Sequence, residues 1–134
     1  MELKKSYKLF VIWLICFLIL MFGVCFIPGL DSVIMTRLVF NLCSWSIVSL
    51  CYMIYKTEYV YWFNGTTYEQ AVKAGEERRK DFALKHLKRF YYFAIIYLLL
   101  SLIFHLYHVK FWVDIYLFTV GIIITAISTI KIKL

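Results

Sequence analysis

The stretch "LFVIWLICFLILMFGVCFI", residues 9–27, decides the fold class, because it contains no charged residue and no proline. A bilayer core about 30 Å thick is crossed by roughly 20 apolar residues in a helix, so this stretch predicts a membrane span. A secretory signal has a shorter apolar run and a small-residue cleavage site after it, and neither feature is present here. We therefore interpret the run as a retained span.

The composition of the whole chain agrees with a lipid environment. The chain has 134 residues, 63% of them hydrophobic, which is more apolar surface than a soluble domain of this length buries. A net charge of +7 would indicate nucleic acid for a soluble protein. In a membrane protein, basic residues instead collect in cytoplasmic segments beside anionic lipid. We expect a bilayer that includes anionic lipids as a partner, and no nucleic acid.

Three further segments have the length and composition of spans, namely residues 33–55, 90–109 and 111–130. Pro28 and Gly29 separate the first two spans, and a short turn around Lys110 separates the last two. The sequence therefore predicts one all-α polytopic membrane domain, residues 1–134, with four transmembrane helices in two hairpins. A cytoplasmic amphipathic helix is expected in the connector, residues 56–89, between the second and third spans.

The distribution of Lys and Arg predicts the orientation. One side of the membrane would hold the connector and five flanking lysines: Lys4, Lys5, Lys8, Lys131 and Lys133. The other side would hold only Arg37 and Lys110. We expect a multi-pass protein of the cell membrane, of the small bacterial type, with both termini cytoplasmic. Asn64-Gly65-Thr66 fits a glycosylation acceptor, but on the cytoplasmic side this match arises by chance.

The connector has the signals of a solvated helix. Thr66 with Glu69, or Thr67 with Gln70, has the spacing of a capping box. Glu69–Lys73, Glu76–Lys80 and Asp81–Lys85 are i,i+4 pairs in the favourable order. The helix would either rest on lipid headgroups or dock a cytoplasmic protein. Candidate contacts for lipid or partner are its basic residues: Arg78, Arg79, Lys80, Lys85, Lys88 and Arg89.

Polar residues inside the spans form a second candidate site, because such residues usually face protein or water rather than lipid. They repeat at helical spacing on the second and third spans, and the fourth span begins with an acid. The candidates are Arg37, Asn41, Ser44, Ser101, His105, His108 and Asp114. In a structural interpretation, Arg37 pairs with Asp114 and the histidines lie in the headgroup layer. In a functional one, these residues line an outward-facing pocket for an ion or small solute.

Motifs of catalysis are missing from the sequence, which has no glycine-rich phosphate loop, nucleophile elbow or dense carboxylate cluster. His105 and His108 share a helix face, but the sequence offers no further ligands for a metal or haem. We expect no enzyme, metal or cofactor. The favoured function is a non-enzymatic subunit or regulator, with a membrane-protein partner or a homo-oligomer, acting through the connector helix and the lateral surfaces. The alternative is a small oligomeric transporter or channel that uses Arg37, Asn41, His105 and Asp114.

Overall fold

The computed structural model describes residues 3–63 and 65–134, and helices make up all the regular secondary structure in these ranges. Four of them are long and apolar enough to cross a membrane: α1 (Lys8–Cys25), α2 (Ser32–Thr57), α3 (Tyr68–Leu106) and α4 (Phe111–Ile130). The short 3-10 helix η1 (Val60–Trp62) follows α2. The all-helical prediction is confirmed. Asn64, which carries the glycosylation match, lies outside the described residues.

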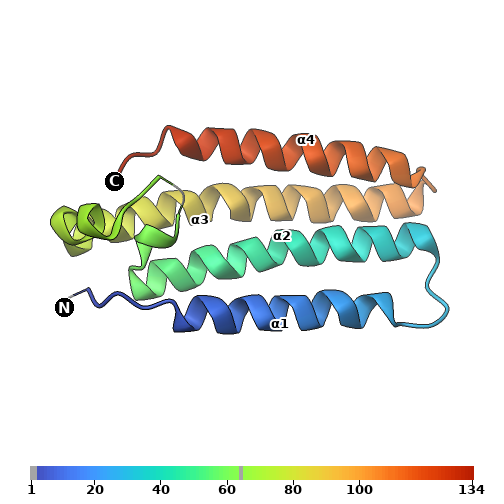
Figure 1. Cartoon of the computed structure of the whole chain (residues 1–134). Helices are drawn as coiled ribbons and strands as arrows, with labels where there is room; N and C mark the ends of the chain where they lie inside the picture. The colour runs from blue at the N-terminus through green and yellow to red at the C-terminus, as the bar shows by residue number, and fades with distance from the viewer. Residues whose placement is uncertain (1–2, 64) are drawn as a thin grey trace.

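The four long helices lie side by side, and both ends of the chain are at the same end of the bundle (Figure 1). We call this end the terminal end, and the opposite end, with the α1–α2 and α3–α4 turns, the loop end. At the loop end, α1 stops before Pro28, and the N–H groups of Phe26 and Ile27 donate to carbonyls of the last turn at 3.2 Å. Asp31 then caps α2, because its carboxylate accepts from the N–H of Val33 at 3.1 Å.

The connector is helical from Tyr68 onward, and its helix is broken once before the third apolar segment. Thr67 and Gln70 form the capping box, and α3 runs from Tyr68 into the third apolar segment. The helical path breaks at Gly75 (φ 80°, ψ 166°), in a region of backbone conformation that essentially only glycine adopts. Residues 76–89 are therefore a continuation of the third span beyond its apolar part. Only the short piece 68–74 has a direction of its own, because the break comes at Gly75 and not where the sequence turns polar.

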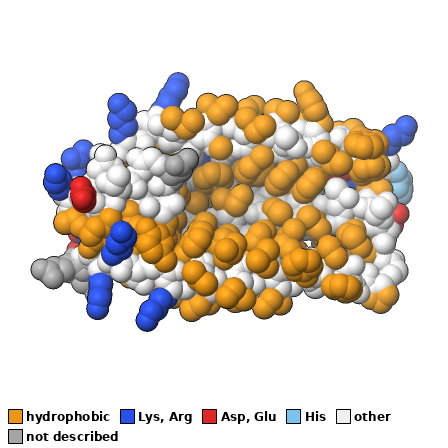
Figure 2. Space-filling view, in the orientation of Figure 1, with side chains coloured by type: hydrophobic (Ala, Val, Ile, Leu, Met, Phe, Trp, Pro, Cys, Tyr) orange, Lys and Arg blue, Asp and Glu red, His pale blue; other side chains and the backbone are white. Residues whose placement is uncertain are grey.

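Helix packing centres on α2 and α3, which share the largest contact in the bundle. Smaller contacts join α1 to α2 and α3 to α4. Helix α1 also meets η1, because the ring centroids of Phe10 and Trp62 lie 5.5 Å apart. The apolar helices keep most of their side chains on the surface, as Figure 2 shows along the middle of the molecule. Lys and Arg gather in the same view at the terminal end. This banding is what a bilayer-spanning protein requires.

The buried apolar cluster lies at the terminal end rather than among the spans. It is formed by Ile54, Val60, Tyr61, Ala71, Phe82 and Ala83. The N-terminal segment crosses this cluster, and the Tyr61 hydroxyl both accepts from the N–H of Ser6 at 2.8 Å and donates to its carbonyl at 2.9 Å. Burial raises the pKa of Tyr61. The packed structure therefore continues beyond the ends of the apolar segments, and the contacts of this cluster hold the connector in place.

Candidate functional site

The polar residues of the spans meet at the loop end around one ion pair. Arg37 of α2 donates from Nε to both carboxylate oxygens of Asp114, at 3.2 and 3.1 Å, and from Nη2 to Asp114 Oδ2 at 3.0 Å. Nη2 also donates to the carbonyl of Val109 at 2.7 Å. Asp114 is fully buried and Arg37 is 6% exposed. Asp114 lies in the first turn of α4, where the helix dipole favours a negative charge.

Asn41 and Ser101 extend this pair toward the middle of the bundle. The Asn41 amide donates to the Arg37 carbonyl at 2.9 Å and to the Ser101 hydroxyl at 3.0 Å, which joins α2 to α3. Ser44 is buried, but its hydroxyl donates within its own helix to Phe40 at 2.9 Å. Four of the seven candidates therefore form one connected network: Arg37, Asn41, Ser101 and Asp114.

His105 and His108 do not join the network. Both are exposed, and no hydrogen bond or ion pair connects either of them to Arg37 or Asp114 in the described structure. The helical spacing correctly relates His105 to Ser101, but α3 ends at Leu106, and His108 lies in the turn with a left-handed backbone (φ 52°). Both histidines lie at the loop end, where α3 finishes, and their side chains are exposed rather than turned into the bundle. Within the described residues, no three His, Cys, Asp or Glu side chains gather as a metal site.

Two buried polar atoms beside the network have no protein partner within the described residues. They are Oδ1 of Asn41 and the hydroxyl of Tyr97. Tyr97 lies one turn before Ser101 on α3 and is 2% exposed. A buried polar atom without a hydrogen bond is costly and calls for a partner such as water. These two atoms are therefore the buried polar atoms of the site that remain available for a further hydrogen bond.

A second buried ion pair holds the terminal end. Arg79 donates from Nε and Nη2 to Glu58 Oε2, at 3.0 and 2.7 Å, and from Nη1 to the carbonyl of Ala71 at 3.1 Å. Glu58 caps α2 in a left-handed conformation (φ 60°). Lys80 lies 3.5 Å from the same carboxylate. The pair ties the end of α2 to α3 and to the piece 68–74.

The sequence did not distinguish Arg79 from its basic neighbours, and Glu58 was missed altogether. The grouping of Arg79 with the lipid or partner contacts needs correction, because Arg79 is 4% exposed and its guanidinium is bound inside the protein. Lys80 and Lys85 pair with Glu76 and Asp81, as predicted. The third predicted pair, Glu69–Lys73, does not form within the described residues, and Lys73 lines a groove. The remaining candidates are exposed and form no ion pair within the described residues: Arg78, Lys88 and Arg89.

When the chain was compared with models of known families, with curated proteins and with solved structures, none matched. Its function is therefore argued from its own residues.

Proposed function

We propose that this chain is a small, non-enzymatic membrane subunit or regulator that acts through its terminal end and its lateral apolar surfaces. The observation that supports this proposal most is the mutual engagement of Arg37 and Asp114. The guanidinium and the carboxylate bind each other and the Val109 carbonyl, so these charges act as a link between α2 and α4. A solute pocket would instead need them turned toward an open space.

We further propose that the terminal end is cytoplasmic, with each of the two hairpins entering and leaving the membrane on that side. The Lys and Arg residues gathered at this end support the orientation through the positive-inside rule. A cysteine at Lys73, in a background without native cysteines, should resist an impermeant thiol reagent applied to intact cells. A cysteine at Lys110 should react. Ready labelling at Lys73 would reverse the orientation.

Two exposed surfaces are suited to a partner. Among the long helices, α1 contacts only α2 within the described residues, and it presents large apolar side chains along its length. The terminal end presents the basic side chains Arg78, Lys88 and Arg89, which form no ion pair within the part of the chain that the structure describes. An apolar helix face fits another membrane helix, from a second copy or a different protein, and basic side chains beside it set orientation and partner choice.

The test is affinity purification in mild detergent with two variants of one exposed residue. Val72 is 49% exposed in the piece 68–74. Val72→Pro costs about 3 kcal/mol within a helix and should unfold this piece while the spans remain. Val72→Ala is the matched control. The parent chain and Val72→Ala should retain the same membrane partner in fixed proportion, and Val72→Pro should lose it. Retention by Val72→Pro would exclude this piece as the docking element.

One observation favours the transporter or channel as a second candidate. Asn41 Oδ1 and the Tyr97 hydroxyl are buried and unpartnered beside the ion pair, as polar groups on a hydrated path would be. Solute flux in proteoliposomes that Tyr97→Phe abolishes, without a change in melting temperature, would favour transport. Equal leakage from empty liposomes and from liposomes with the protein would favour the subunit.

A further inference from the structure

A groove with a volume of about 1080 Å³ lies at the terminal end. It lies between α3, the end of α4 and the residues that follow α4. This volume is at the upper limit of the roughly 300–1,000 Å³ typical of sites for small ligands. The groove is independent of the Arg37–Asp114 network, which lies at the other end of the bundle.

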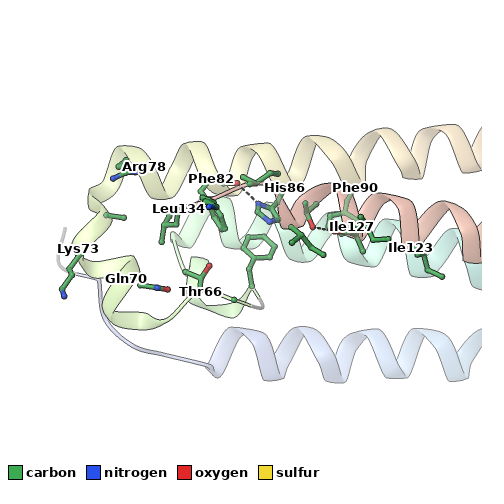
Figure 3. Close-up of a pocket in the computed structure, with 18 residues that line it drawn as sticks. Thr66, Gln70, Lys73, Arg78, Phe82, His86, Phe90, Ile123, Ile127 and Leu134 are labelled. Carbon is green, nitrogen blue, oxygen red and sulfur yellow. Dashed lines mark hydrogen bonds between the residues drawn. The ribbon is translucent and has the colours of Figure 1, made fainter.

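The chemistry of the groove changes along its length. Ile123, Ile127 and Phe90 line the part that faces the apolar middle of the bundle, whereas Lys73 and Arg78 lie at the far end (Figure 3). Lys133, after α4, adds a third cation, and no Asp or Glu side chain is part of the lining. The buried part of the lining has no negatively charged side chain either. His86 is buried there, with its Nδ1 3.0 Å from the Phe82 carbonyl and its ring stacked on Phe63.

The three cations of the groove differ from three of their basic neighbours, Arg79, Lys80 and Lys85, in forming no ion pair within the described residues. Arg79 and Lys80 bind Glu58, and Lys85 binds Asp81. Lys73, Arg78 and Lys133 form no ion pair within the described residues, and all three are exposed. The cations that line the groove therefore remain available to an anion, as do Lys88 and Arg89 outside it. An anion is the complement to this arrangement.

We propose that the groove binds an anionic phospholipid, with an acyl chain along Ile123 and Ile127 and the phosphate among Lys73, Arg78 and Lys133. A soluble anion would leave the apolar part of the groove unused, and a neutral lipid would leave the three cations without a partner. A single amphiphile with a negative headgroup satisfies both parts. This assignment does not depend on whether the chain is a regulatory subunit, because it rests on the groove alone.

The test uses native mass spectrometry of the full chain in detergent, with dioleoylphosphatidylglycerol and dioleoylphosphatidylcholine as probes. A basic residue near the lipid surface is worth about fivefold in affinity, so three cations predict a preference for the anionic lipid of on the order of tenfold to 100-fold. The variant Lys73→Gln/Arg78→Gln/Lys133→Gln should lose this preference. The control Lys4→Gln/Lys8→Gln/Arg89→Gln removes the same charge from exposed residues outside the groove and should keep it.

A third variant tests whether the groove binds the whole lipid or only its headgroup. Ile127→Trp fills the apolar part and keeps every cation, so it should weaken binding of the lipid, and glycerol 3-phosphate should fail to displace the lipid from the parent chain. Equal affinity for the two lipids, or equal losses in the groove variant and its control, would overturn the proposal. Displacement by glycerol 3-phosphate, or unchanged binding to Ile127→Trp, would overturn the assignment of an acyl chain to the groove.

Discussion

The two ends of the bundle are held by arginine–carboxylate pairs of the same chemistry in different surroundings. Arg37–Asp114 joins α2 to the start of α4, and Arg79–Glu58 joins the end of α2 to α3. In each pair the arginine also donates to a backbone carbonyl, that of Val109 or Ala71. Asp114 is fully buried, whereas the Glu58 side chain is 14% exposed and has Lys80 as a second cation.

This difference shows how strongly each charge depends on its partner. Asp114 has one cationic partner and no access to solvent, so loss of Arg37 leaves a lone buried charge in an apolar segment. Glu58 retains Lys80 and some water when Arg79 is lost. The pair at the loop end should therefore stabilise the whole bundle, and the pair at the terminal end should order the connector locally.

Removal of Arg37 should have the largest effect. Arg37→Met leaves Asp114 buried without a counter-charge, which costs about 3–5 kcal/mol in the free energy of unfolding. Thermal melting in detergent measures the loss. Lys110→Met is the control, because Lys110 is an exposed cation at the same end and should change stability little. Equal losses in the two variants would show that the Arg37–Asp114 pair adds nothing specific.

Removal of Arg79 should have a smaller and local effect. Arg79→Met gives up charge-assisted hydrogen bonds, and loss of such bonds costs about 1.5–3 kcal/mol. Amide hydrogen exchange should become faster in residues 59–74 and stay unchanged in α4. Arg78→Met is the matched control, since Arg78 is the exposed neighbour. Faster exchange throughout the bundle would contradict a local role for this pair.

Two glycines extend the comparison, because Gly121, in the middle of α4, and Gly75, near the terminal end, exclude a side chain for different reasons. A Cβ at Gly121 would lie 2.7 Å from the Phe93 ring, whereas Gly75 has open space but a φ of 80°. Gly121→Ala should lower the melting temperature through overpacking of about 1–3 kcal/mol. Gly75→Ala should cost about 1–3 kcal/mol through backbone strain, seen as faster exchange in residues 68–74. Gly23→Ala, at an open helical position, should not destabilise.

The smallest effect is the pH dependence that His86 adds to the terminal end. Burial lowers the pKa of His86, and the nearby Arg89 lowers it further. Below the unfolded value of about 6.5, the unfolded chain binds a proton that the folded chain resists, so stability falls as the pH falls. The melting temperature should drop between about pH 7 and about pH 5, and the drop should be smaller in His86→Phe. An equal drop in both proteins would assign it to other groups.

The sequence was most informative at positions where a charged residue occurs within an apolar segment. Arg37 and Asp114 are conspicuous because charged residues rarely occur in apolar segments, and the structure brings them together. Glu58 and Arg79 lie in a connector full of charged residues, where nothing in the local pattern marks a buried pair. Their pairing depends on the left-handed cap at Glu58 and on the path of the chain through Gly75. Such features come from tertiary packing, which periodicity does not encode.

We propose that Arg37 and Asp114 form a structural link rather than a site for a solute. A double-mutant cycle on detergent melting tests this claim most directly, with Arg37→Met, Asp114→Leu and the variant that carries both changes. We predict that the double variant is more stable than either single variant, because neither charge is then left alone. Losses that add in the double variant, as for two independent residues, would contradict it.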